Sequence, residues 1–465
     1  MTALRGILKL VIFIFVLVFT KAHASESERV ESLRDQALES SLAFDLLESL
    51  TTEVGARMPG SPQDKLAVQW AQKKFAALGF DKVWTEPVKF NPWVRGEESA
   101  RIISPFEQNL HITALGLSVA TPIQGLKAQI VHYETVEKLV AAPAGSAAGK
   151  IVFISRKMQR HRDGKGYGPV VKARSIGAVE AAKKGAIALV IRSVGTDTHR
   201  LPHTGMLRYE DKVKKIPAGA ISSPDADLLV RMLKRGKPVI LKLKLLSQRL
   251  SEYTSHNVIA EMTGTSLPQE KIVIGGHLDS WDLGTGAVDD GAGVAITMAA
   301  AKLIGDSEQR PRRTIRVVLW ANEEQGLIGA KAYARVHQGD LANHVVGAES
   351  DFGAGKIYGF ASKVDPINQK RVEQMARLLK PLGVDYVGNN ARPGPDLIPM
   401  ARLGMPVFSL KQDGSDYFDV HHTADDTLDK VKPENLAQNV AAYVVFAYLA
   451  ANSEYKFQFT PELNK

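Results

Sequence analysis

The stretch KIVIGGHLDSWDLGTGAVDDGAGVAITMAAAKLI, residues 271–304, decides the fold. It begins with an apolar run, passes through a glycine-rich loop that carries His277, Asp279 and two adjacent aspartates, and ends in an apolar segment of helical length. A buried strand, a loop and a helix form the repeating unit of a parallel sheet. In such sheets the chemistry lies at the carboxyl ends of the strands, which is where His277 and the aspartates stand.

The same alternation continues to the end of the chain. Further apolar runs predict strands at 257–261, 271–275, 314–320, 344–349 and 407–411. Helical spacing predicts helices at 291–304, 327–336, 367–382 and 433–451. The sequence therefore predicts an α/β fold whose mostly parallel, doubly wound sheet is covered by helices on both faces.

Residues 109–250 differ from the rest of the chain in their sequence pattern. Short β-like runs at 150–155, 186–192 and 239–245 alternate with turn residues and one short helical segment. We interpret 109–250 as a β-rich domain inserted into the catalytic domain. Residues 25–108 and 251–465 then make up the catalytic domain.

The first 24 residues are typical of a secretory signal peptide. Arg5 and Lys9 precede the apolar run 10–19, and the small-residue pattern Ala22-His23-Ala24 follows. The run is shorter than the ~20 residues that span a bilayer. An uncleaved N-terminal anchor is the alternative interpretation. We expect export to the periplasm or the extracellular space, with no stable membrane anchor once residues 1–24 are removed.

Composition narrows the chemistry further. The 465 residues include no cysteine, which excludes disulfides, thiolate zinc sites, iron–sulfur clusters and cysteine nucleophiles. A metal would have to be held by His, Asp and Glu. The formal net charge of +9 falls to +6 when Arg5, Lys9 and Lys21 leave with the signal segment. Like charges form no long run, so we expect no nucleic-acid partner.

Five polar clusters in the α/β region carry residues that ligate metals. They are His277 with Asp279, Asp289 with Asp290, Glu323 with Glu324, Glu349 with Asp351, and His421 with His422. Each cluster alone is more typical of a structural role, such as a hydrogen bond, a helix cap or a solvated helix start, than of a metal site. Together, carboxylates and imidazoles after separate strands are typical of Zn²⁺. Paired glutamates also allow one to bind metal while the other takes a proton from water.

These five motifs, in their order and spacing, resemble those of the co-catalytic two-zinc exopeptidases of the aminopeptidase Y type. The likeness is strongest to a carboxypeptidase branch of that family, and it extends into the insert at 177–183 and 202–205. The resemblance implies the zinc exopeptidase fold with a protease-associated domain as the insert. It also implies two Zn²⁺ per chain, a peptide substrate with free termini and a homodimer.

The resemblance also implies a role for each motif residue. The zinc ligands would be His277, Asp289, Glu324, Asp351 and His422. Asp289 would bridge the two ions, and Asp279 would orient His277. Glu323 would be the general base when a zinc-bridging hydroxide attacks the scissile carbonyl. The neighbouring His421 is the alternative ligand, but His422 directly precedes Thr423 in the family's pattern.

Three further residues are weaker candidates for contact with substrate. Tyr417 could donate to the oxyanion or be a core aromatic. Asp396 could line the specificity pocket or cap a helix, and His203 could contact substrate or be a packed histidine. Two other functions stay open beside the exopeptidase: a non-catalytic receptor on the same scaffold, and a one-zinc transferase like glutaminyl cyclase. The complete ligand set favours the exopeptidase, without fixing dipeptidase, aminopeptidase or carboxypeptidase preference.

Overall fold

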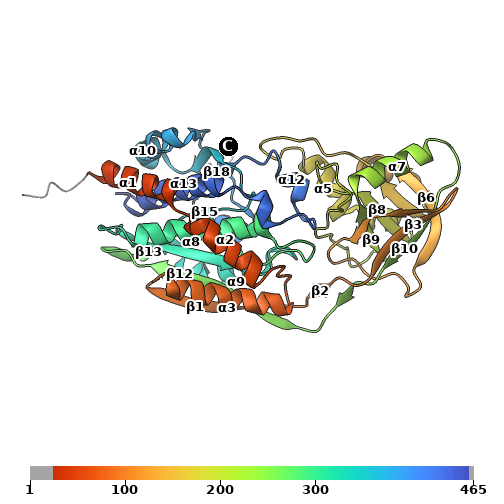
Figure 1. Cartoon of the computed structure of the whole chain (residues 1–465), viewed down its shortest axis with the longest axis horizontal. Coiled ribbons are helices and arrows are strands. Elements are labelled where there is room, and N and C mark those ends of the chain that lie inside the picture. Colours follow the sequence, from red (N-terminus) through yellow and green to blue (C-terminus); the bar gives the residue numbers. More distant parts are fainter. Residues whose placement is uncertain (1–24, 460–465) are drawn as a thin grey trace, which may run out of the picture.

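The computed structural model describes residues 25–459, and the predicted signal segment 1–24 lies outside this range. Two α/β parts lie side by side along the long axis of the molecule (Figure 1). Each is built on its own eight-stranded sheet. Within residues 25–459, no helix combines the length and the apolar character that a membrane span requires.

The larger part holds the sheet predicted from the sequence. Its strands follow the order β1-β12-β14-β13-β15-β18-β16-β17. The four central strands, from β14 to β18, run parallel, whereas β1, β12 and β16 pair antiparallel to their inner neighbours. The strands are β1 (Lys82–Phe90), β12 (Tyr253–Met262), β13 (Leu267–His277), β14 (Arg313–Trp320), β15 (His344–Glu349), β16 (Ile357–Lys363), β17 (Asp385–Tyr386) and β18 (Val407–Gln412).

Helices cover both faces of this sheet, as the sequence predicts. Alternate residues of a strand point to opposite faces, so Ile272 and Ile274 enter one core while Val273 enters the other. The first face packs against α3 (Pro62–Ala77), α8 (Ala292–Gly305) and α13 (Pro433–Ala451). Helices α1 (Glu26–Glu39) and α2 (Leu42–Glu53) form a further layer on α8 and α13. The second face packs against α9 (Ile328–His337) and α11 (Ile398–Leu403).

The five strands predicted for the α/β region lie within β12, β13, β14, β15 and β18. The four helices predicted there correspond to α8, α9, α10 and α13. Helix α10 (Gln369–Leu379) is extended at both ends by short 3-10 turns, at Pro366–Asn368 and Lys380–Leu382, which together fill the predicted range 367–382. Strand β16 was not predicted. A short helix, α12 (Tyr417–Val420), follows β18.

The smaller part is the insert. Its sheet has the order β4-β3-β10-β6-β7-β8-β9-β5, with parallel pairing from β6 to β9. The strands are β3 (Glu98–Ser104), β4 (Gln108–Leu110), β5 (Ile112–Ala114), β6 (Leu126–Tyr133), β7 (Ile151–Ile154), β8 (Ala188–Arg192), β9 (Ala218–Ile221) and β10 (Ile240–Leu245). The helices are α4 (Val136–Ala141), α5 (Gly168–Ser175), α6 (Gly177–Lys183) and α7 (Ser223–Leu233).

The insert sheet begins at β3, before the expected boundary at residue 109. Because β3 pairs with β10, we propose that the insert starts near residue 98 and ends near residue 245. The short strands β2 (Trp93–Val94) and β11 (Gln248–Arg249) pair where the chain enters and leaves it. On the other side, α12 lies where the two parts meet (Figure 1). There the backbone N–H of Thr196 donates to the carbonyl of Phe418 at 2.9 Å, which ties the insert to α12.

Candidate metal centre

The polar clusters converge at the carboxyl ends of the central strands. His277 is the last residue of β13, Glu323 and Glu324 follow β14, and Asp351 follows β15. His422 lies just after α12, the short helix that follows β18. Because these strands are parallel neighbours, residues far apart in sequence meet at one edge of the sheet. The five predicted ligands and Glu323 are therefore brought together.

Asp289 lies at the centre of this group, with a histidine beside each of its carboxylate oxygens. Oδ1 is 3.1 Å from His277 Nε2, and Oδ2 is 3.1 Å from His422 Nε2. Asp351 Oδ1 lies 3.6 Å from the first imidazole nitrogen. Glu324 Oε2 lies 3.2 Å from the second. These distances place Asp351 beside His277 at one oxygen of Asp289, and Glu324 beside His422 at the other.

The adjacent Asp290 is also close to His277, but its carboxylate is already used. Oδ2 accepts a hydrogen bond from the backbone N–H of His277 at 3.0 Å, and Oδ1 accepts one from Gly293 N at 3.2 Å. Asp290 thus ties β13 to the first turn of α8. This bonding leaves Asp289 as the aspartate of the pair whose oxygens face the histidines.

Asp279 is placed beside His277 and the paired glutamates. Its backbone carbonyl, not its carboxylate, lies 3.0 Å from His277 Nδ1. With Nδ1 donating there, Nε2 is the nitrogen that faces Asp289 and Asp351. The Asp279 carboxylate instead accepts from the backbone N–H groups of Glu323 at 3.0 Å and Glu324 at 3.2 Å. One residue therefore orients the imidazole and fixes the glutamate turn.

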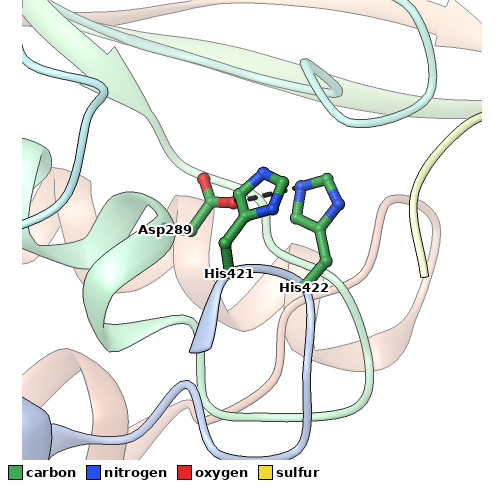
Figure 2. A group of neighbouring side chains, drawn as sticks. All are labelled: Asp289, His421 and His422. Atoms are coloured by element: carbon green, nitrogen blue, oxygen red, sulfur yellow. Dashed lines mark ion pairs between the residues drawn. The ribbon is translucent and has the colours of Figure 1, made fainter. Parts of the chain in front are cut away.

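The two consecutive histidines both face Asp289 (Figure 2). His422 has a left-handed backbone, with φ of 61°, and its ring stacks on that of His421 with centroids 3.5 Å apart. His422 Nε2 reaches both Asp289 and Glu324, whereas His421 Nε2 is 3.6 Å from Asp289 alone. Of the two histidines, His422 is therefore the one whose Nε2 lies close to two carboxylates.

Buried negative charge dominates the electrostatics of the centre. Burial raises the pKa of Glu323 well above its usual value and that of Asp351 above its own. Burial also raises the pKa of Glu349 to about 8, and nearby Asp351 adds to this effect. Burial opposes protonation of His422, but Glu324 and Asp289 outweigh it and raise its pKa to about 9. A bound cation would relieve this crowding of carboxylates.

Two buried residues to which the sequence analysis gave no role shape the loop that holds Asp289. Arg57, which is fully buried, donates to the carbonyls of Leu278 (2.6 Å), Thr285 (2.6 Å) and Gly286 (2.8 Å). Asp426 accepts from the backbone N–H groups of Val288 and Asp289. A lone arginine in a turn-rich loop carries no sequence signal for this role, because its acceptors come from a distant segment.

The insert contacts the histidine loop directly. His203 is buried, with Nδ1 2.6 Å from the carbonyl of His421 and Nε2 2.8 Å from Asp197 Oδ1. Thr204 N donates to the His422 carbonyl at 3.0 Å, and the Thr204 carbonyl lies 3.4 Å from His422 Nδ1. Both ring nitrogens of His203 are therefore engaged within the protein, which leaves neither for a substrate.

The other two predicted substrate residues lie beside the centre. Tyr417 is buried in α12, and its ring packs against Phe352 and His421 with centroids 5.0 and 4.9 Å apart. Asp396 is 1 % exposed, and neither of its carboxylate oxygens accepts a hydrogen bond from the described residues. Burial, with Glu349 and Glu323 nearby, raises the pKa of Asp396 well above its usual value.

The donor set fits the binding of divalent metal. Two imidazoles and three carboxylates present their ligand atoms at one place, and no thiolate is required. Asp289 Oδ2 and Glu324 Oε1 are buried without a hydrogen bond from any described residue, although buried polar atoms are normally paired. Their lone pairs are available to metal ions. The fold and this donor set define a metallopeptidase-type centre.

Comparison with known proteins places the chain more narrowly. Residues 257–447 match the family model described as Peptidase family M28. Carboxypeptidase Q of Xenopus laevis is 36 % identical over 412 residues, covering 89 % of this chain and 86 % of the relative. The human Carboxypeptidase Q is 35 % identical over the same length. The chain belongs to peptidase family M28, which confirms both the metallopeptidase assignment and the likeness to its carboxypeptidase branch.

Solved structures agree with this placement. The crystal structure of a peptidase M28 precursor from Shewanella amazonensis is 55 % identical, with a TM-score of 0.92, and covers 94 % of this chain and 99 % of that one. A zinc aminopeptidase from Bacillus subtilis is 20 % identical, with a TM-score of 0.63, and covers 90 % of this chain and 97 % of that one. The second structure shares the fold, which confirms the predicted α/β class.

Proposed function

We propose that the chain is an exported two-zinc exopeptidase that hydrolyses dipeptides or short peptides with free termini. The observation that carries the proposal is the position of Asp289, whose two oxygens each lie 3.1 Å from a different histidine. His277 and Asp351 would hold one zinc ion, and Glu324 and His422 the other. Asp289 would bridge them. The zinc aminopeptidase fold of the Bacillus subtilis protein supports the choice of metal.

The reaction follows from the residues around the two ions. When bound, the zinc pair supplies Lewis acidity that activates water and polarises the scissile carbonyl. Glu323 accepts the proton of the attacking water and returns it to the leaving amine. Asp279 holds the backbone of Glu323, so the base keeps its position through both transfers. The signal segment 1–24 supports export to the periplasm or the extracellular space, and the family likeness supports a homodimer.

Metal removal tests this function. We expect the purified protein to contain about two zinc ions per chain and to hydrolyse a dipeptide, and a chelator should abolish hydrolysis until zinc is restored. At a free zinc concentration 100 times the Kd of a site, binding at that site should also add about 2.7 kcal/mol to the free energy of unfolding. Elemental analysis, dipeptide assays and thermal melting measure these effects. Less than one zinc per chain, together with no hydrolysis, would reject the proposed function.

Support of the histidine loop by the insert gives a second test. In His203→Gln, loss of the contact to the His421 carbonyl should weaken zinc binding at the His422 site by about 10- to 100-fold, the usual effect of losing support behind a ligand. Competition with a chromophoric chelator measures the affinity. His132→Gln is the control, because His132 lies in the insert and contacts Ser155. Equal zinc affinity in both variants would contradict a supporting role for His203.

A further inference from the structure

The segment that leads from the catalytic domain into the insert carries a largely buried arginine, Arg95. It follows strand β2, and its side chain is 10 % exposed. Its Nε and Nη2 donate to the Asp282 carboxylate at 2.9 and 3.0 Å, and its Nη1 donates to Glu98 at 2.8 Å. Burial opposes the charge of the guanidinium, but Asp282 and Glu98 outweigh this effect and raise the pKa of Arg95. The cation therefore joins the start of the insert to a loop of the catalytic domain.

That loop is the one that begins at the proposed zinc ligand His277. Asp282 lies five residues further along the chain. The preceding residue, Trp281, packs its ring with the centroid 6.2 Å from that of Trp93 in β2 and 5.7 Å from that of His422. Because the guanidinium holds the Asp282 carboxylate through two hydrogen bonds, it fixes the end of this loop against β2.

A further bond of the guanidinium leads to the second histidine. Arg95 Nη2 donates to the hydroxyl of Thr204 at 3.1 Å, and this hydroxyl donates to the Ala114 carbonyl at 2.8 Å. Thr204 is fully buried in the insert. Its backbone N–H binds the His422 carbonyl at 3.0 Å, and its own carbonyl faces His422 Nδ1 at 3.4 Å. The Thr204 hydroxyl thus connects Arg95 to the support behind His422.

Segment 93–95 also contacts the glutamate turn. Gln325, which follows Glu324, exchanges two hydrogen bonds with the backbone of Trp93. Its Oε1 accepts from the Trp93 N–H at 3.1 Å, and its Nε2 donates to the Trp93 carbonyl at 3.2 Å. One short segment is therefore bound to the loops that follow His277 and Glu324, and through Thr204 to the loop of His422.

The two histidine loops differ in how far they depend on these contacts. His277 ends β13, which pairs with a strand on each side, and its backbone N–H also bonds to Asp290. His422 lies outside the sheet, in a loop where its backbone is left-handed. The sheet therefore holds His277, whereas the insert contributes to holding His422 through Thr204.

We propose that Arg95 is a positioning residue of the metal centre, which holds the His422 loop in a fixed place relative to the His277 loop. It acts through Thr204 and Asp282. A planar guanidinium suits this task because it donates in several fixed directions at once, which an ammonium group does not. The inference rests on the proposed function and adds that the insert, through Arg95, sets the affinity of the zinc site at His422.

Titration of the purified protein with zinc against a competing chelator tests the proposal. Arg95→Gln should weaken zinc binding at the His422 site by about tenfold, the lower end of the usual effect of losing support behind a ligand. The His277 site should keep its wild-type affinity, because the sheet holds that histidine. His422→Ala shows which binding step belongs to which site, since it lacks the ligand of the His422 site.

Arg313→Gln is the matched control for loss of a buried arginine. Arg313 is 2 % exposed and pairs with Glu270 at 2.6 Å, but it begins β14, at the end of that strand opposite to the glutamate turn. Arg313→Gln should lower the melting temperature and leave both zinc affinities unchanged. A merely structural role of Arg95 would give this result too.

Thr204→Val provides a second variant that removes little else. Valine has nearly the same shape as threonine, the backbone bonds to His422 remain, and the Ala114 carbonyl keeps its bond from Arg95 Nη1 at 2.9 Å. Thr204→Val should weaken the His422 site by about tenfold as well. The double variant should bind zinc no more weakly than the weaker single variant, because both changes break the same connection. Losses that multiply would show that Arg95 acts by another route and would overturn the inference.

The remaining outcomes separate the inference from the proposed function. Wild-type affinity at the His422 site in either variant, or equal loss at both zinc sites, would overturn the role of Arg95 and leave the exopeptidase standing. Should Arg95→Gln fail to fold, the Thr204→Val titration decides the question alone. If the wild-type protein binds less than one zinc per chain and hydrolyses no dipeptide, the proposed function fails and the inference fails with it.

Discussion

Glu323→Gln is expected to lower dipeptide turnover by about 10²- to 10⁴-fold, the usual contribution of a general base, while zinc content stays at the wild-type level. Glutamine has the same shape but cannot accept the proton of the attacking water. Glu323 is placed for this task because Asp279 binds its backbone N–H, and its neighbour Glu324 is the residue that faces His422. Steady-state kinetics and elemental analysis of the same preparation measure both quantities.

The matched variant is Glu324→Gln. If the two glutamates divide base and ligand as proposed, Glu324→Gln loses zinc and activity together, whereas Glu323→Gln loses activity alone. Turnover near the wild-type level in Glu323→Gln would reject the base assignment. Zinc loss in Glu323→Gln with zinc retained in Glu324→Gln would show that the two roles are exchanged.

His422→Ala is expected to reduce the zinc content from about two ions per chain to about one, because the second site would keep only Asp289 and Glu324, and a catalytic zinc normally has three protein ligands. His421→Ala should keep both ions. The distances support this order, since His422 Nε2 lies 3.1 Å from Asp289 and 3.2 Å from Glu324, while His421 approaches Asp289 alone, at 3.6 Å. Elemental analysis after dialysis measures the difference.

The two histidines provide controls for each other because they are adjacent, buried and stacked. A variant that merely disturbed the loop would affect zinc content to a similar degree in both. Loss of zinc in His421→Ala with retention in His422→Ala would move the ligand by one position. Loss of both ions in His422→Ala would mean that the two sites do not fill independently.

Much of the fold could be predicted from the sequence because its signals are local. The apolar strand before His277 and the helix after Asp290 are read from a single continuous stretch. The predicted start of the insert differs from the observed one because a strand there pairs with a distant segment. Strand β3 belongs to the insert only because it pairs with β10, which lies more than a hundred residues later in the chain.

The candidate site, like the fold, could be predicted only in part from the sequence. The motif residues could be named from their chemistry, but their partners could not. The Asp279 carboxylate holds the glutamate turn, and Asp290 bonds to the backbone of His277; neither bond follows from spacing alone. His203, a candidate for substrate contact, lies buried against the His421 carbonyl. These contacts join segments that approach each other only after the sheet has formed.

The sequence by itself determined the α/β alternation, the cysteine-free donor set and the residue types available for metal and base, because periodicity and side-chain chemistry are properties of the chain. Only the tertiary structure decided how the donors are shared. It placed one oxygen of Asp289 beside each of two histidines and connected the loops of those histidines through Arg95. Distance, burial and orientation arise from packing between remote segments, so no local pattern encodes them.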